Sequence, residues 1–211
     1  MHVTLLTWEF PPRNVGQVSR DMEALAKALV TAGHAVDVIT FHESITGTER
    51  RKEGFQVHRV GNTIRTHVNI VTWAMILNTE FERVATDIIL ASEGEQTVHA
   101  SEWLCVPAAV QLKRTLMVPF VLSLHSLESN RSSGGPLSGA ITYLERLGCS
   151  EASQLFLRDN DMVETVKGTY GILEDALIVV PSFRLDAEKF VRRYAIAAAS
   201  LTTYGSRAES H

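Results

Sequence analysis

The feature that most constrains the fold is the alternation of short apolar runs with amphipathic helical segments along the chain. Several of the apolar runs are continuous and rich in β-branched residues, as is typical of strands buried on both faces. Strands that alternate with helices predict an α/β fold: a doubly wound, mostly parallel sheet with helices on both faces. The predicted strands cover residues 2–7, 35–40, 55–60, 97–100, 119–124, 154–157 and 176–180.

Two of the intervening segments have a clear helical period, residues 20–33 and residues 70–90. The first ends at Gly33, a residue type that commonly terminates helices. Its apolar residues fall on one stripe, formed by Met22, Leu25, Ala26 and Leu29. A second stripe is predicted in the longer segment, from Ile70, Trp73, Leu77, Phe81, Val84 and Ile88.

Composition excludes several classes of protein. The chain has 211 residues, 45% of them hydrophobic, which is enough for one α/β domain with a buried core. A net charge of −4 argues against a nucleic-acid surface, which would need clustered Lys and Arg. The short basic run at 192–194 is interpreted as a solvated helix face.

The cysteines, the first residues and the longest apolar stretch predict the compartment and the cofactor requirement. Cys105 and Cys149 lack metal-binding spacing and are expected to lie buried in helices, in a reducing compartment. The first residues do not resemble a signal peptide, and the longest apolar stretch, 69–78, is about half a membrane span. We therefore expect a cytoplasmic protein with no membrane or nucleic-acid partner, no bound metal and no cofactor.

Ligands of open parallel sheets bind beyond the carboxyl ends of the strands. This rule directs attention to the loops that follow Thr7, Ala100, Leu124, Leu157 and Val180.

Those loops carry a family resemblance. "LLTWEFPPRNVG" followed by "ALAKALVTAGHAVDVIT" resembles the start of GT-B fold glycosyltransferases, above all the archaeal-type glycogen synthase and starch synthase group. Matching segments continue in the same order over about residues 1–190. The resemblance implies that residues 1–186 form the N-terminal, Rossmann-like half of such an enzyme, followed by a helical tail over 187–211. In that family this half holds the acceptor glucan and helps to hold the sugar of ADP-glucose or UDP-glucose.

The first loop departs from the family pattern. The resemblance implies substrate contacts from Glu9, Gly16 and Gln17 in this loop. Where the family has Gly-Gly-Leu-Gly, this chain reads "GQVS", so Gln17 and Ser19 replace glycines. If those positions need left-handed backbone, each side chain costs roughly 1–2 kcal/mol. Asp21 and Glu23 are predicted to lie in the first helical turn, where they compete with a bound anion.

Two further loops supply the remaining candidate residues. "HASEW" stands where the family has His-Asp-Trp, which implies substrate contacts from Glu102 and Trp103. The alternative for Glu102 is a helix N-terminal acid. His125 in "LSLHS" matches a family histidine near the donor sugar, where a neutral imidazole can bond a sugar hydroxyl; its alternative is structural. His99 is predicted to be structural.

The loop after the strand at 154–157 also departs from the family. Asp159 and Asn160 stand where the family commonly has Ser and Arg, which predicts that an anion site has become acidic.

Two functional hypotheses follow from the resemblance. The first is a glucosyltransferase half that is inactive alone; it acts with a separate polypeptide supplying the C-terminal domain or as a homo-oligomer, or it is a fragment of a longer protein. The second is a non-catalytic module that binds glucan or another protein on the same scaffold. The family's second domain, which carries most of the nucleotide pocket, is not recognisable in this sequence.

Overall fold

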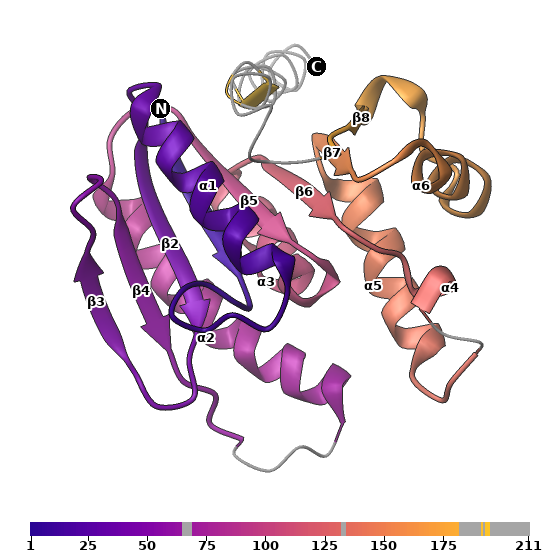
Figure 1. Cartoon of the computed structure of the whole chain (residues 1–211), viewed down its shortest axis with the longest axis horizontal. Helices are drawn as coiled ribbons and strands as arrows, with labels where there is room; N and C mark the ends of the chain where they lie inside the picture. The colour runs from indigo at the N-terminus through magenta and orange to yellow at the C-terminus, as the bar shows by residue number, and fades with distance from the viewer. Residues whose placement is uncertain (65–68, 132–133, 182–190, 192, 195–211) are drawn as a thin grey trace, which may run out of the picture.

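The structure is a computed structural model that describes residues 1–64, 69–131, 134–181, 191, 193 and 194. Eight strands form one sheet in the order β3-β4-β2-β1-β5-β6-β7-β8 (Figure 1). Neighbouring strands are parallel except for the antiparallel pair β3–β4. The strands are β1 His2–Thr7, β2 Ala35–Phe41, β3 Gly47–Arg50, β4 Gln56–Val60, β5 Gln96–Ser101, β6 Phe120–Leu124, β7 Gln154–Leu157 and β8 Leu177–Val179.

All seven predicted strands are confirmed to within two residues, and β3 was not predicted. The four residues of β3, "GTER", are all exposed at the edge of the sheet. An exposed edge strand has no buried face, so it lacks the apolar pattern that identifies a strand in a sequence.

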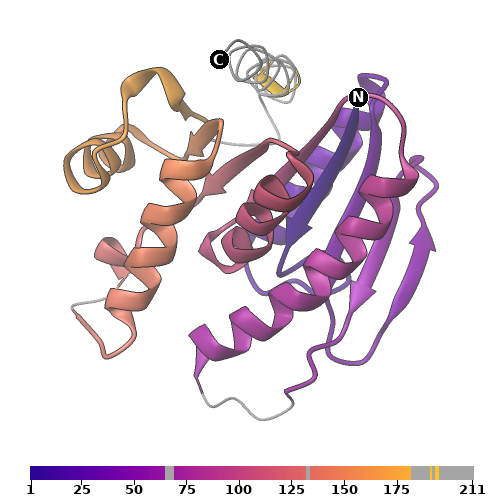
Figure 2. The same cartoon turned by 180° about the vertical axis from the view of Figure 1, so that it is seen from behind.

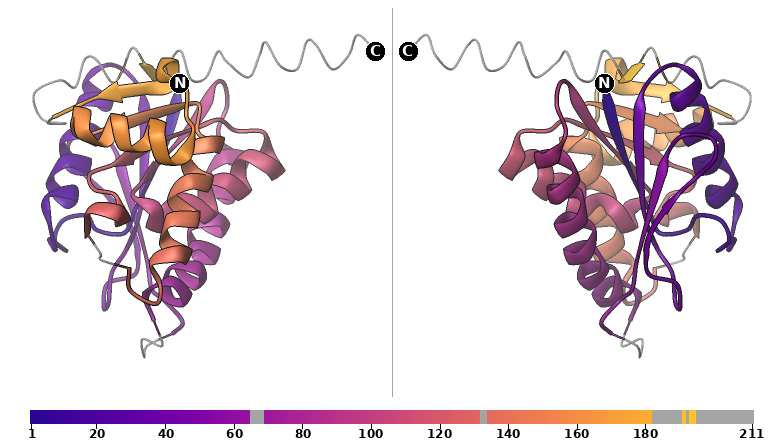
Figure 3. Two further views of the ribbon diagram at one scale, coloured as in Figure 1. Left: turned by 90° about the vertical axis from the view of Figure 1, so that its right-hand side faces the viewer. Right: turned by 90° about the vertical axis from the view of Figure 1, so that its left-hand side faces the viewer.

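Helices cover both faces of the sheet (Figures 1 and 2). One face packs against α2, α3 and α5, and the other against α1, as the edge-on views of Figure 3 show. The helices are α1 Gln17–Thr31, α2 Ile70–Ala91, α3 Val106–Leu116, α4 Glu128–Arg131, α5 Ser138–Glu151 and α6 Asn160–Thr165. Short helical turns lie at Trp103–Cys105 (η1), Val166–Tyr170 (η2) and Glu174–Ala176 (η3).

Helix α1 begins at Gln17, earlier than predicted, so the residues after Gly16 occupy other helical positions than expected. Asp21 is the fifth helical residue, so the placement of Asp21 and Glu23 in the first turn was wrong. Gln17 and Ser19 have helical backbone, and the only non-glycine residues with positive φ in the described ranges are Glu102 and Met117. The expected left-handed strain at Gln17 and Ser19 is therefore absent.

Buried residues of α2 differ in part from the predicted stripe. Trp73, Leu77 and Phe81 are buried, but Ile70 is 36% exposed because it starts the helix beyond the core. The buried face continues instead to Ala85 and Ile89.

The face of the sheet beside α1 is also covered by Tyr194, whose side chain is fully buried. Its ring stacks on His99 and Phe156, with centroids 5.9 and 6.1 Å away. The rest of the predicted tail, apart from residues 191 and 193, lies outside the described residues, as does the end of the predicted 1–186 domain.

Asp37 gives this fold a defined response to acid. It accepts hydrogen bonds from His2 Nε2 at 2.7 Å and from His58 Nε2 at 2.5 Å. Burial alone would raise the pKa of Asp37, but the two hydrogen bonds outweigh burial and lower the pKa to about 2. The unfolded value is about 3.9, so the unfolded chain binds more protons between the two values. The stabilisation is thus present above pH 4 and is lost as pH falls through 2.

We expect the advantage of the wild-type protein over Asp37→Asn to shrink by about 2 kcal/mol between pH 5 and pH 2. Urea unfolding of both proteins across this range measures the difference directly. Parallel pH profiles for the two proteins would contradict the assignment.

Candidate functional site

The carboxyl ends of β1, β5 and β6 lie side by side, and the loops that follow them enclose two adjoining cavities. The α1 cavity has a volume of about 170 Å³ and lies between α1 and the ends of β6, β7 and β8. The β5 cavity has a volume of about 250 Å³ and lies between the first loop and η1. All the predicted site residues line one or both of these cavities, namely Glu9, Gly16, Gln17, Glu102, Trp103 and His125.

Glu9 shapes the first loop. Its buried carboxylate accepts hydrogen bonds from the backbone N–H groups of Val15 and Gly16, both at 2.7 Å. A Cβ at Gly16 would lie 3.3 Å from Glu9 Oε1, while the φ of Gly16 is −142°. Glycine at position 16 therefore lets the backbone pass close to the Glu9 carboxylate, and it does not form a left-handed turn.

Ser19, which stands where the family has glycine, is accommodated inside the same loop. Its side chain is fully buried, and its hydroxyl donates to Asn14 Oδ1 at 2.6 Å. This contact ties the start of α1 to the loop before it. Gln17, by contrast, lines the α1 cavity.

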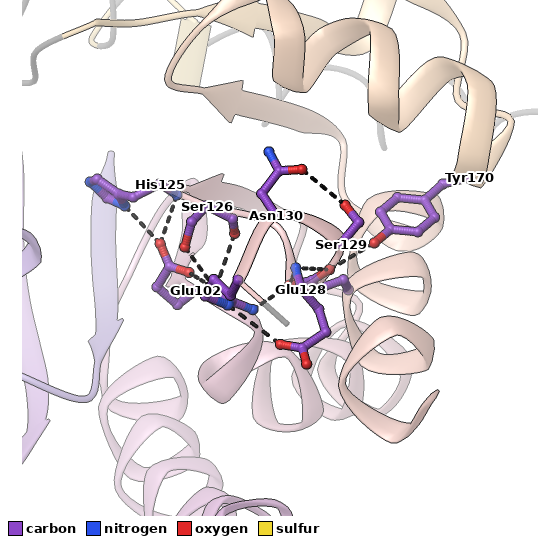
Figure 4. A network of polar contacts seen from close by, with 9 residues as sticks. Glu102, His125, Ser126, Glu128, Ser129, Asn130 and Tyr170 are labelled. Atoms are coloured by element: carbon purple, nitrogen blue, oxygen red, sulfur yellow. Dashed lines mark hydrogen bonds and ion pairs between the residues drawn. The ribbon is translucent and has the colours of Figure 1, made fainter. Parts of the chain in front are cut away.

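Glu102 sits in backbone geometry that side chains rarely adopt, with φ 67° and ψ 163°. Such geometry costs about 1–3 kcal/mol and persists only where surrounding contacts hold it. Glu102 Oε1 accepts hydrogen bonds from the His125 backbone N–H at 2.7 Å and from His125 Nδ1 at 2.8 Å (Figure 4). Glu102 is the N-cap residue of η1, as the alternative placed it, but its side chain makes no capping hydrogen bond.

His125 lies between two carboxylates. Its Nε2 is 3.4 Å from Asp21 Oδ2, on the side opposite Glu102. Burial would lower the pKa of His125, but Asp21 and Glu102 together outweigh burial and raise it to about 9. His125 is thus an imidazolium at neutral pH, and both ring nitrogens face carboxylates. This differs from the neutral imidazole expected from the resemblance.

Arg131 links the β5 cavity to a buried network behind it. It donates to Ser126 Oγ at 2.8 Å and to Glu145 Oε1 at 2.6 Å, and its Nη1 lies 3.7 Å from Glu102 Oε2. Glu145 is fully buried and also accepts from the Glu128 N–H and the Tyr170 hydroxyl. Burial raises the pKa of Glu145. The network fixes α4 and the loop that follows β6.

Three charged residues of this edge were not among the predicted site residues: Asp21, Arg131 and Arg158. Arg158 follows β7, lines the α1 cavity and forms no ion pair with any residue that the structure describes. Asp159 instead caps α6, accepting a hydrogen bond from the Met162 N–H at 2.9 Å. The predicted conversion of an anion site to an acidic one was therefore wrong, because the adjacent arginine, not the aspartate, lines the cavity.

His99 is fully buried, consistent with a structural role. It bonds to Ser123 Oγ at 2.8 Å and to the Tyr194 hydroxyl. Burial, and to a smaller extent the nearby charge of His125, lowers the pKa of His99 to about 3.

The described residues contain no group of three or more His, Cys, Asp or Glu side chains arranged to hold a metal ion. A further cavity of about 600 Å³ lies between α2 and the β3–β4 hairpin, and contains none of the predicted site residues. Within the described ranges, every helix is too short or too polar to span a bilayer.

Comparison with known families identifies the fold and its class. A family model described as "Glycosyl transferase 4-like domain" matches residues 16–182. The chain belongs to this family. An uncharacterised glycosyltransferase of Methanocaldococcus jannaschii is 32% identical over 85% of this chain. A glycogen synthase of Mycobacterium tuberculosis is 27% identical over 81% of it. The chain spans about half of these relatives, 45% of each.

Solved structures agree on the fold of this glycosyl transferase 4-like domain. Sucrose-phosphate synthase from Thermosynechococcus elongatus aligns with a TM-score of 0.70 and 13% identity, over 86% of this chain and 48% of that chain. The catalytic domain of starch synthase IV from Arabidopsis thaliana, bound to ADP and acarbose, aligns with a TM-score of 0.57 and 13% identity. That match covers 86% of this chain and 51% of the synthase. The expected doubly wound, Rossmann-like half of a GT-B fold is confirmed.

Proposed function

We propose that this domain is the N-terminal half of a glucosyltransferase that transfers glucose, with retention, from ADP-glucose or UDP-glucose to an α-glucan. The observation that carries the proposal is the convergence of all six predicted site residues on two adjoining cavities at the carboxyl edge. The glycogen synthase relative and the starch synthase bound to ADP and acarbose support this substrate class.

The polar contacts assign different roles to these residues. Glu9 holds the first loop, while Glu102 and Asp21 hold His125 as a charged ring, so these groups build the walls of the site. Trp8 and Trp103 line the β5 cavity, and aromatic side chains are suited to packing against a sugar. Gln17 and Arg158 remain to contact polar groups of a ligand.

Transfer also needs charge stabilisation on the departing nucleoside diphosphate. We propose that a second, C-terminal domain supplies it, either in a longer protein that contains this domain or on a separate polypeptide, that residues 1–211 alone are inactive, and that no metal cofactor is required. We place the reaction in the cytoplasm, as the composition predicts.

A second candidate function is a non-catalytic module that binds glucan or another protein. The observation that favours it is that Glu9, Glu102 and His125 direct their hydrogen bonds to protein groups. These residues could therefore persist for stability alone.

The test is a transfer assay with ADP-glucose or UDP-glucose and a maltooligosaccharide. The whole chain is assayed alone and together with the separately produced C-terminal half of the M. tuberculosis glycogen synthase. We expect oligosaccharide elongation only in the mixture. Calorimetric binding of maltooligosaccharide without transfer would favour the module, and binding of neither sugar nor donor would contradict the proposal.

A further inference from the structure

Trp8 is the first residue after β1, and it lines the β5 cavity. A side chain in a loop lacks the strand neighbours that would fix its rotamer, so its position depends on contacts from other parts of the chain. One such contact comes from Arg13, whose guanidinium carbon lies over the Trp8 ring, 4.8 Å from the ring centroid. This distance is within the range of a cation–π interaction. Arg13 therefore contacts directly a residue of the proposed sugar site.

Hydrogen bonds fix the guanidinium of Arg13 against Trp8. Its Nη1 donates to the backbone oxygen of Trp8 at 3.2 Å, and its Nε donates to Glu43 Oε1 at 2.7 Å. The ion pair with Glu43 contributes little by itself, because the Glu43 side chain is 56% exposed. The ring contact and the bond to the Trp8 backbone are therefore the contacts by which Arg13 can affect the site.

Arg13 also connects Trp8 to the hydrophobic core. Its guanidinium carbon lies 5.1 Å from the ring centroid of Phe41, and Phe41 packs edge-on against Trp73 with centroids 4.9 Å apart. Phe41 ends β2, and both Phe41 and Trp73 are buried. Arg13 thus joins a ring that the core holds in place to a residue that lines the cavity.

Arg13 is not itself part of the cavity wall. In the part of the chain that the structure describes, it lines neither the α1 cavity nor the β5 cavity. The other strong contact of the first loop, from the Glu9 carboxylate, fixes the backbone at Val15 and Gly16. Any effect of Arg13 on a ligand in the β5 cavity therefore passes through Trp8.

We propose that Arg13 is a positioning residue for the glucan: it holds Trp8 in the orientation in which this side chain packs against a sugar ring in the β5 cavity. The inference rests on the proposed function and deepens it, because it assigns the sugar contact to Trp8 and the control of Trp8 to Arg13. A side chain that is already held loses less conformational freedom when a ligand binds, so the contact with Arg13 raises the affinity for glucan.

Calorimetric titration of the whole chain with a maltooligosaccharide tests the proposal in a double-mutant cycle. Arg13→Gln should weaken binding about fivefold, because ordering the Trp8 side chain then opposes the binding step. Arg13→Lys keeps the charge but loses the planar set of donors, and should weaken binding about twofold. In a Trp8→Ala background, Arg13→Gln should change the affinity by no more than about 1.5-fold, because the contact that it removes is already absent.

Arg51→Gln is the matched control. Arg51 is a partly buried arginine, 24% exposed, that pairs with Glu23 at 3.3 Å and with Glu49 at 3.0 Å. It lines neither cavity in the described part of the chain, so its replacement should leave the affinity for the maltooligosaccharide unchanged.

Acrylamide quenching of tryptophan fluorescence measures how firmly Trp8 is held when no ligand is present. Arg13→Gln should increase the quenching of the wild-type protein and should not increase that of Trp8→Ala. A residue that only stabilised the fold would lower the free energy of unfolding without this dependence on Trp8.

Three outcomes would overturn the inference: unchanged affinity and quenching in Arg13→Gln, a fivefold weakening by Arg13→Gln that persists in the Trp8→Ala background, or an equal weakening by Arg51→Gln. If the wild-type protein binds no maltooligosaccharide, the proposed function fails, and the quenching comparison alone decides whether Arg13 positions Trp8.

Discussion

Replacing Glu102 with alanine should destabilise the protein by about 3 kcal/mol and lower the pKa of His125. The substitution removes the oxygen that accepts from both the His125 backbone N–H and Nδ1, yet it leaves the strained backbone in place. Asp21 remains close to the ring, but without Glu102 it offsets less of the effect by which burial lowers the pKa of His125. Urea unfolding and NMR titration of the imidazole signals measure the two effects.

The pH dependence of the protein's stability follows from the direction in which the pKa of His125 is shifted. Its folded pKa of about 9 lies above the unfolded value of about 6.5, so the folded state binds the extra proton. The stabilisation is fully present below pH 6.5 and is lost as pH rises through 9. The alanine variant should show a smaller loss over this range.

Glu102→Gly is the matched control for the strain. Glycine adopts φ 67° without the Cβ penalty, so the glycine variant should be more stable than the alanine variant by about 1 kcal/mol. A glycine variant less stable than the alanine variant, or an alanine variant as stable as the wild type, would contradict this account of Glu102.

Glu145→Ala should cost about 4 kcal/mol, the largest loss that we expect from a single substitution in the network behind the site. Glu145 is fully buried and bonds Arg131, Tyr170 and the backbone N–H of Glu128. Alanine leaves the Tyr170 hydroxyl and the Glu128 N–H without this acceptor in the interior, whereas Arg131, whose side chain is 31% exposed, keeps its bond to Ser126. Chemical denaturation provides the measurement.

Glu151→Ala is the control from the same helix, α5. Glu151 pairs with Lys113 at 3.0 Å and Arg114 at 2.5 Å, but its side chain is 23% exposed, so the loss should stay below about 1 kcal/mol. Similar losses for the two variants would show that the buried network contributes no more than a surface ion pair.

The architecture could be predicted because strands buried in a parallel sheet are continuous apolar runs in the sequence. The position of the site could also be predicted, since the carboxyl ends of a parallel sheet meet at one edge. The edge strand Gly47–Arg50 could not, because its residues are all exposed and carry no buried pattern.

The roles of the site residues depended on contacts between distant segments. Glu102 meets His125 only because β5 and β6 are neighbours, and Asp21 meets it from α1. No local pattern encodes those distances, so the charge of His125 was missed. The resemblance likewise directed attention to Asp159 and Asn160, although the turn after β7 places Arg158 at the cavity and Asp159 at the start of α6.

Nucleotide sugar and glucan are proposed to bind at the carboxyl edge around His125. The most direct test of this binding follows the imidazole signals of the whole chain by NMR during titration with ADP-glucose, UDP-glucose and a maltooligosaccharide. We predict a saturable shift of the His125 signal with a donor and with the oligosaccharide, while His58 on β4, held by Asp37, stays unchanged. An unmoved His125 signal with every ligand would contradict the claim.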